Sequence, residues 1–129
     1  MLTSAQRAFL NEVHYGVLGT LNHDQTVQQT LVWYVFEDEC FRFSVGANSI
    51  KVRNIQRTGT ATLTVVAGKH YCTVSGAAYV EPADVEFRRR LAERYINDPE
   101  RVAAWMLRRP DAPRATLRLT IRNVYGQGV

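Results

Sequence analysis

The stretch TATLTVVAGKHYCTVSGAAYV, residues 60–80, decides the fold class. From Ala61 to Val65 every second residue is apolar and the residues between are threonines, which is the two-residue period of a half-buried strand. Gly68-Lys69 follows, and a second strand-like run extends from His70 to Val80. Two such runs joined by a two-residue turn with glycine predict an antiparallel β-hairpin.

Similar strand patterns lie on both sides of this hairpin. Residues 15–21, 27–36 and 40–45 are rich in β-branched and aromatic residues and are separated by turn-like segments, which predicts a three-stranded meander. The acidic run 37–39 between two of these strands is interpreted as a hairpin tip rather than a calcium loop. Near the C-terminus, apolar residues alternate with threonine and arginine over residues 116–122, which predicts a half-buried strand with a cationic outer face.

Two helices are predicted in the first half of the chain. Thr3 and Gln6 have the spacing of a capping box, and three apolar residues share one face at helical spacing: Ala5, Phe9 and Val13. Asn48 is expected to be the N-cap of a short helix that runs through about Arg57.

Two more helices are predicted after Pro82. The first places three apolar or aromatic residues on one face: Phe87, Leu91 and Tyr95. Asp98-Pro99 begins the second, which ends at Arg109-Pro110 and directs Val102, Trp105 and Met106 inward. The count is six strands and four helices, with the strands in hairpins. We therefore expect a mainly β, antiparallel small barrel with peripheral helices, because closure removes exposed strand edges.

Length and composition favour an ordinary globular protein. The 129 residues form one expected domain, 1–129, with 46% hydrophobic and 22% charged residues. No apolar run approaches the roughly 20 residues of a membrane span. Cys40 and Cys72 are expected to be buried small hydrophobes rather than a disulfide or zinc site. The absence of a visible secretory signal and the low cysteine content lead us to expect a cytoplasmic protein.

The charge balance is positive and arginine-rich. Sixteen basic residues against twelve acidic ones give a net charge of +4, which favours an anionic partner: nucleic acid, a phosphorylated cofactor or an acidic metabolite. The run Arg88–Arg90 is interpreted as a solvated helix face whose arginines pair with Glu86 and Glu93.

The sequence nominates no side chain for covalent or metal chemistry. None of the three histidines has a partner at metal-ligand spacing, so no metal site is predicted. Gly126-Gln127-Gly128 precedes no helix and is not a dinucleotide fingerprint. An enzyme of this sequence would therefore use a bound cofactor as its reactive group.

One segment carries a ligand signal. Residues 43–54, FSVGANSIKVRN, read as strand, turn and helix, with a hydroxyl at Ser44 and cations at Lys51 and Arg53. A helix start with free N–H groups and nearby cations can bind a phosphate. Trp33 and Tyr34, on a neighbouring strand, suit either core packing or a ligand wall.

The order and spacing of three motifs resemble a known family. They are VWY at 32–34, the strand-turn-KxRN segment at 44–54 and RATLRLTIRNVYGQG at 114–128. The chain is similar, from its first helix to Gly126, to the pyridoxamine-phosphate-oxidase-like split β-barrel proteins. More narrowly, it resembles the small flavin- and deazaflavin-dependent reductases that use FMN or coenzyme F₄₂₀.

The resemblance implies a fold, a partner and a reaction. It implies a six-stranded antiparallel split barrel that forms a homodimer, with FMN or F₄₂₀ at the interface and hydride transfer to a small conjugated or planar substrate. Ser44 and Lys51 match phosphate-contacting positions, and Ser49 stands where many relatives carry an arginine. Residues that border the cofactor ring or its site would be Thr30, Leu31, Val32, Trp33 and Val45. Tyr34 and Tyr125 are candidate proton donors, and no membrane partner is expected.

Two alternatives stay open. The first is a non-enzymatic carrier of a cofactor or ligand on the same fold. The second is a small barrel that binds nucleic acid, which the arginine content suggests. This second alternative is disfavoured, because the arginines lack the interleaved exposed aromatics of a base-stacking platform.

Overall fold

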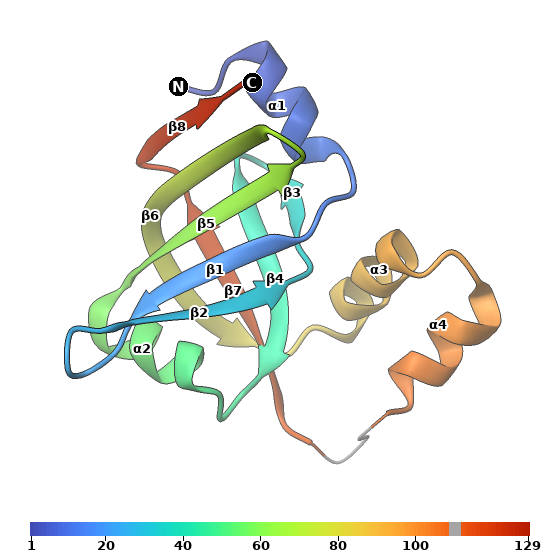
Figure 1. The fold of residues 1–129 in the computed structure, drawn as a ribbon. Coiled ribbons are helices and arrows are strands. Elements are labelled where there is room, and N and C mark those ends of the chain that lie inside the picture. Colours follow the sequence, from blue (N-terminus) through green and yellow to red (C-terminus); the bar gives the residue numbers. More distant parts are fainter. Residues whose placement is uncertain (109–111) are drawn as a thin grey trace.

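A curled antiparallel sheet forms the body of the molecule (Figure 1). The computed structural model describes residues 1–108 and 112–129, and within these ranges the sheet has eight strands in the order β2-β1-β5-β6-β7-β4-β3, with β8 paired to β6. The strands are β1 (Gly16–Leu21), β2 (Val27–Val32), β3 (Val35–Glu37), β4 (Cys40–Gly46), β5 (Thr60–Ala67), β6 (His70–Pro82), β7 (Arg114–Thr120) and β8 (Asn123–Gln127). The expected mainly β split barrel with peripheral helices is confirmed, and the expected number of six strands is wrong.

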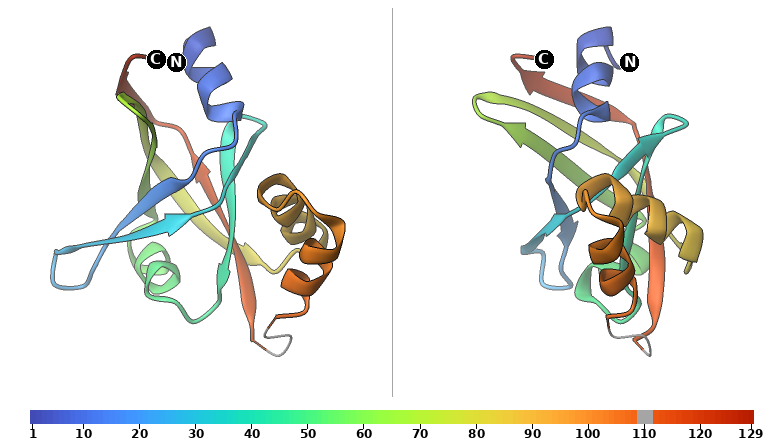
Figure 2. Two further views of the ribbon diagram at one scale, coloured as in Figure 1. Left: turned by 45° about the vertical axis from the view of Figure 1, so that its right-hand side comes forward. Right: turned by 90° about the vertical axis from the view of Figure 1, so that its right-hand side faces the viewer.

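Helices cover the ends and one side of the barrel. They are α1 (Ser4–Asn11), α2 (Ile50–Thr58), α3 (Val85–Tyr95) and α4 (Pro99–Met106). Figure 2 shows α1 at one end of the sheet, α2 at the other end, and α3 with α4 together at the side. The apolar faces of both halves of the sheet meet inside the barrel, where the largest fully buried side chains include Phe41, Phe43, Leu63 and Leu117.

The first additional strand arises because the run 27–36 is broken at Trp33 and Tyr34. β2 pairs with β1, whereas β3 pairs with β4 in the other half of the barrel. At the break, the backbone N–H of Tyr34 donates to the hydroxyl of Tyr95 over 3.1 Å. A side chain of α3 therefore takes the place of a neighbouring strand.

The second additional strand follows a break at Ile121 and Arg122. β7 ends at Thr120, and the backbone N–H of Arg122 donates to the carbonyl of Ser75 over 2.8 Å. β8 then pairs with the first half of β6, while β7 pairs with its second half. At the crossing, a Cβ on Gly76 would lie 1.9 Å from the Thr120 carbonyl oxygen, so the close approach requires glycine.

The hairpin of residues 60–80 forms as predicted. Ala67 pairs with His70, so Gly68 and Lys69 are the two-residue loop. The acidic run is also a hairpin tip: Glu37 pairs with Cys40, and Asp38 and Glu39 both have positive φ.

The helix starts were predicted more accurately than the helix ends. The capping box of Thr3 and Gln6 is present, but α1 ends at Asn11, and its buried residues are Gln6, Phe9 and Leu10. The expected face with Ala5 and Val13 is therefore wrong, because both are exposed. The N-cap of α2 is Ser49 rather than Asn48.

The two later helices start where the sequence placed them. Phe87 and Leu91 of α3 are buried, and the Asp98 side chain accepts from the first backbone N–H groups of α4, which begins at Pro99. α4 ends at Met106, earlier than predicted, and the predicted end at Arg109-Pro110 lies outside the described residues.

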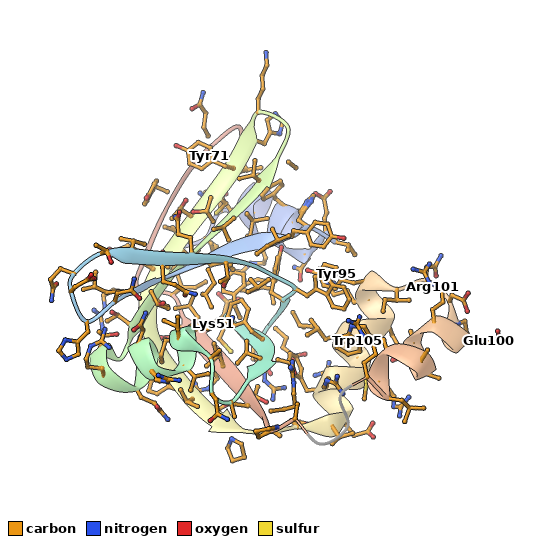
Figure 3. The ribbon with its side chains drawn as sticks, turned by 60° about the horizontal axis from the view of Figure 1, so that its bottom comes forward. Lys51, Tyr71, Tyr95, Glu100, Arg101 and Trp105 are labelled. Atoms are coloured by element: carbon orange, nitrogen blue, oxygen red, sulfur yellow. The ribbon has the colours of Figure 1, made fainter. Side chains whose placement is uncertain are left out.

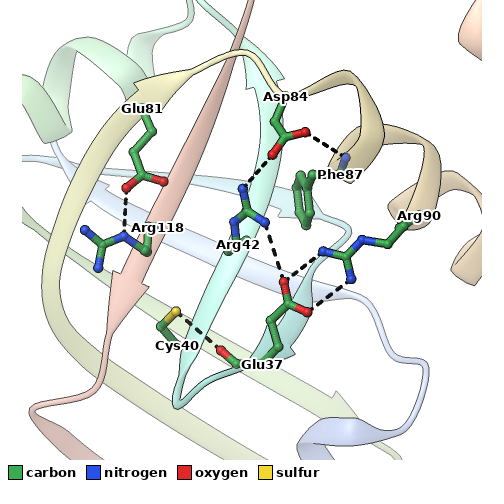
Figure 4. A network of polar contacts seen from close by, with 8 residues as sticks. All are labelled: Glu37, Cys40, Arg42, Glu81, Asp84, Phe87, Arg90 and Arg118. Atoms are coloured by element: carbon green, nitrogen blue, oxygen red, sulfur yellow. Dashed lines mark hydrogen bonds and ion pairs between the residues drawn. The ribbon is translucent and has the colours of Figure 1, made fainter.

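A network of charged side chains attaches α3 to the barrel (Figure 4). Arg90 forms two hydrogen bonds to Glu37 of β3, at 2.9 and 3.1 Å. Arg42 of β4 lies between Glu37 and Asp84, the N-cap of α3, and over the ring of Phe87. None of the ion pairs in the described residues joins the run 88–90 to Glu86 or Glu93, so the expected pairing within the helix is wrong there; Arg88 and Arg90 contact α4 and β3 instead.

Candidate functional site

A cavity of about 310 Å³ lies between the end of β2, β4, the start of α2 and the start of β7. Six of the eight predicted site residues line it: Leu31, Val32, Trp33, Ser44, Val45 and Lys51. Three lining residues were not predicted: Gly46, Leu91 and Arg114. The strand-turn-helix segment and the VWY motif, which are separate in the sequence, therefore meet at one place.

Thr30 and Ser49 do not line this cavity, although their side chains share an unusual feature. The hydroxyl oxygens of both are buried without a hydrogen-bond partner within the described ranges. Ser49 also makes no side-chain capping bond to α2, although its backbone N–H donates to the Gly46 carbonyl over 3.1 Å. The turn just before Lys51 therefore holds a buried hydroxyl whose hydrogen-bonding capacity is unused by the described residues.

Two strands and a helix bring the polar side chains together. Ser44 lies near the end of β4, and Gly46 at its end pairs with Arg114 at the start of β7. The chain then turns, and Lys51 lies in the first turn of α2. One Nη of Arg114 donates to the Ser44 hydroxyl over 3.2 Å.

Two cations, Lys51 and Arg114, dominate the electrostatics of the described part of the cavity. None of the ion pairs found in residues 1–108 and 112–129 includes Lys51 or Arg114. Burial and, second, the nearby Arg114 lower the pKa of Lys51. Burial and, second, the nearby Arg88 lower the pKa of Arg114. Without a ligand, keeping these two side chains charged therefore costs free energy, and a bound anion would lower that cost.

Trp33 borders the cavity as part of an aromatic stack. Its ring lies 4.9 Å from that of Tyr95 and almost parallel to it, at 2°. On α4, the Trp105 ring stacks at 5.3 Å, and Arg88 lies 4.4 Å above Trp105. Figure 3 shows Tyr95 and Trp105 on the side of the barrel covered by α3 and α4, apart from Lys51. Tyr95 and Trp105 both stack on the Trp33 indole, so part of its ring surface is already covered by protein.

The two candidate proton donors lie away from the cavity. Tyr34 is fully buried and its hydroxyl donates to the Leu10 carbonyl over 2.9 Å. Burial raises its pKa well above the ordinary value. The interpretation of Tyr34 as core is confirmed, and its assignment as a proton donor has no support in this geometry. Tyr125, on β8, is 60% exposed and lines none of the cavities described here.

Other cavities differ in chemistry. One of about 370 Å³ near Gly19, Thr62 and Gly76 has Arg122 as its one charged lining residue among those described. Another, of about 250 Å³, adjoins the 310 Å³ cavity that Lys51 lines and shares Ser44 and Arg114 with it. No group of three His, Cys, Asp or Glu side chains that could hold a metal ion occurs in the described part of the chain.

Arg114 is the functional candidate that sequence reasoning missed. The predicted last strand began at residue 116, whereas β7 begins at Arg114. Extending the alternation of residues 116–122 back by one step would have placed Arg114 on the face that carries Arg118 and Thr120. That Arg114 lies at the cavity depends on its pairing with Gly46 of β4, and no local sequence pattern predicts this pairing.

The curled antiparallel sheet, closed by helices and split between two halves, defines a split β-barrel protein. The family model described as Pyridoxamine 5'-phosphate oxidase matches residues 2–128, and the chain belongs to that family. The resemblance drawn from the sequence motifs is thereby confirmed.

Individual relatives extend this comparison. The chain is 28% identical over 121 residues to an F420H(2)-dependent biliverdin reductase of Mycobacterium tuberculosis (strain CDC 1551 / Oshkosh), covering 92% of this chain and 83% of the relative. A solved structure of an F420 reductase superposes with a TM-score of 0.80 at 23% identity, covering 96% of this chain and 98% of that one. General Stress Protein 26 from Bacillus anthracis superposes with a TM-score of 0.70 at 18% identity, covering 93% and 88%. These structures share the fold. In the described residues, no helix has the length and apolar character to cross a membrane.

Proposed function

We propose that this chain binds a flavin or deazaflavin cofactor, FMN or F₄₂₀, and uses it to transfer hydride to a small conjugated or planar substrate. The observation that carries the proposal is the pair of cations, Lys51 and Arg114, at one cavity where none of the described carboxylates pairs with them. A phosphate is the anion that both cofactors bring.

The residues present fit such a cofactor. Lys51 supplies a cation, Ser44 a hydroxyl, and Ser49 a buried hydroxyl in the adjoining turn. The neighbouring wall is apolar, with Leu31 and Val45 in the lining. A polar end and an apolar wall suit a molecule with a phosphate at one end and a planar ring at the other.

The protein contributes binding, orientation and shielding to the reaction. The bound ring system supplies the hydride. Lys51 and Ser44 hold the phosphate and so fix the position of the ring along β2. Leu31 and Val32 would contact apolar ring surface of the bound cofactor. Among the described side chains that line the cavity, none is a carboxylic acid, histidine or tyrosine.

The relatives favour turnover over simple carriage of a ligand. A curated relative that spans most of this chain is named as a reductase dependent on F420H(2). Its named substrate, biliverdin, is an extended conjugated molecule, which is the class proposed here. F₄₂₀ is therefore the first cofactor to test, with FMN second.

We also propose that the working unit is a homodimer. Leu31 lines the cavity yet is 68% exposed, so the ring side of the cavity is open in a single chain. A second copy would cover this open side and exclude water from it. Sedimentation at micromolar concentration tests this proposal, and a species of only 14.7 kDa would contradict it.

The decisive experiment is a binding titration with purified protein. Quenching of FMN and F₄₂₀ fluorescence is measured separately, with riboflavin as the phosphate-free control. Tighter binding of FMN or F₄₂₀ than of riboflavin, followed by oxidation of the reduced cofactor in the presence of biliverdin or another conjugated acceptor, is expected. Failure of both cofactors to bind would refute the proposal.

A further inference from the structure

We propose that Arg114, at the start of β7, is the second cation of the phosphate site and binds the phosphate together with Lys51. This inference rests on the proposed function and adds to it a residue from the far end of the chain. The ligand chemistry is a phosphate group, either the monoester of FMN or the diester of F₄₂₀.

The position of Arg114 is central to the site. Ser44 and Arg114 are the two side chains that line both adjoining cavities, of about 310 and 250 Å³. The hydrogen bond from Arg114 to the Ser44 hydroxyl ties the guanidinium to this shared wall. Lys51 lines the larger cavity but not the smaller one. The phosphate is therefore expected on the Lys51 side of the wall that Arg114 forms.

The charges around Arg114 favour an anion. Its Nε is buried without a hydrogen-bond partner among the described residues. Among the described residues, Lys51 on α2 and Arg88 on α3 are charged neighbours of Arg114; both are cations, and both interactions oppose the charge. Asp84, the one carboxylate that lines the adjoining cavity within the described residues, is engaged by Arg42.

Arg88 is not an equal candidate for the same role. Its guanidinium lies over the Trp105 ring and donates to the Met106 carbonyl. Arg88 lines the smaller cavity but not the larger one. It is held by α4 and acts on the phosphate only through its charge. The Arg114 side chain, whose one hydrogen bond to a described residue is to the Ser44 hydroxyl, keeps further N–H groups for an anion.

The geometry of a guanidinium adds more than charge. Arginine can donate two parallel hydrogen bonds to phosphate oxygens, whereas lysine acts as a point charge. A phosphate between the two side chains would receive both kinds of contact. We therefore expect Arg114 to determine the preference for a phosphorylated cofactor over its phosphate-free analogue.

The test compares four proteins: wild type, Arg114→Gln, Arg114→Lys and the control Arg53→Gln. Arg53 was a candidate phosphate cation in the sequence, but it is exposed, lines neither cavity and donates to the Asn48 carbonyl. Its variant therefore loses the same charge near the site without removing a lining group. Affinity for FMN, F₄₂₀ and riboflavin is measured by fluorescence quenching. In parallel, the rise in melting temperature with inorganic phosphate is measured against chloride at equal ionic strength.

Arg114→Gln is expected to weaken binding of the phosphorylated cofactor by about 10- to 100-fold and to change riboflavin binding by less than about 3-fold. Arg114→Lys should fall between wild type and Arg114→Gln, and Arg53→Gln should stay within about 3-fold of wild type. A loss for FMN alone or for F₄₂₀ alone supports the inference and identifies the source of the phosphate.

The outcomes separate this inference from the proposed function. If wild type prefers phosphorylated cofactors and Arg114→Gln does so equally, the inference is overturned and the proposed function stands. If wild type binds neither cofactor, the proposed function fails, and the inorganic phosphate measurement decides. A phosphate-induced rise that is lost in Arg114→Gln then supports the anion site, and no rise in wild type, or an equal rise in both, overturns it.

Discussion

Replacing Trp33 with alanine tests the aromatic stack that borders the cavity. The indole packs against Tyr95 at 4.9 Å and Trp105 at 5.3 Å, and so connects α3 and α4 to the end of β2. Each aromatic pair contributes about 0.5–1.5 kcal/mol beyond its buried area, and loss of a partly buried indole adds on the order of 1 kcal/mol. We expect Trp33→Ala to lower the free energy of unfolding by about 2–4 kcal/mol.

For a chain of this length, that loss corresponds to a fall in melting temperature of about 7–15 °C. Urea unfolding measures it, and a double-mutant cycle with Trp105→Ala isolates the contact between the two rings. Cofactor affinity per folded molecule should fall less than the stability does, because Tyr95 and Trp105 already cover part of the indole. An unchanged unfolding free energy together with abolished cofactor binding would show that a ring face contacts the ligand, and would refute this reasoning.

Three further predictions follow from charged and polar contacts. The Arg90 guanidinium lowers the pKa of Glu37, so Glu37 stabilises the fold above its unfolded pKa of about 4.3, and this contribution should be lost as pH falls through the lower folded pKa. In urea unfolding measured at several pH values, Glu37→Gln should make the free energy of unfolding fall less steeply at acid pH than in the wild type. Asn54→Leu should cost about 2–4 kcal/mol, measured by denaturation, because the buried amide bonds two side chains of the β1–β2 hairpin at 2.9 and 3.0 Å; a cost under about 1 kcal/mol would contradict this. Lys51→Gln should stabilise the cofactor-free protein, since burial and Arg114 disfavour the ammonium in the folded state, and should weaken FMN binding about 10- to 100-fold, since the cation is lost. The stability gain should vanish as pH rises to the ordinary lysine pKa of 10.5, and a gain that persists at that pH would argue against this cause.

The parts of the fold that follow a local period were predictable from the sequence. The 60–80 hairpin has a clear two-residue alternation and a two-residue loop, and the starts of the later helices have Asp98-Pro99 and an i, i+4 apolar face. In these segments the residue pattern, the backbone preference and the packing agree, so local reasoning was sufficient.

The break between β2 and β3 could not be predicted in this way. Val32, Tyr34 and Phe36 are all buried, so the apolar alternation continues through the break as if the strand were unbroken. The break is stabilised by the hydroxyl of Tyr95, 61 residues further along the chain. A tertiary contact of that kind leaves no trace in the local sequence.

The candidate site shows the same division. Ser44 and Lys51 share one short segment, and their proximity follows from its strand-turn-helix pattern. Arg114 joins them only through the register of β4 with β7, which pairs residues about 70 positions apart. Sequence reasoning therefore found the lining from residues 31–33 and 44–51 apart from Gly46, and missed Leu91 and Arg114.

The path of the chain around α3 and α4 has a consequence for how this barrel diversifies. The chain leaves the sheet after Pro82 and returns beside it, since Pro82 and Ala115 are cross-strand partners in β6 and β7. The excursion therefore begins and ends at neighbouring points, and an exchange of the intervening helices that keeps the Tyr95 contact to Tyr34 leaves the strand register in place. Leu91 and Arg88 of this excursion each line one of the two adjoining cavities. Insertions, deletions or grafts between residues 83 and 113 are thus a route by which one barrel acquires a new ligand range.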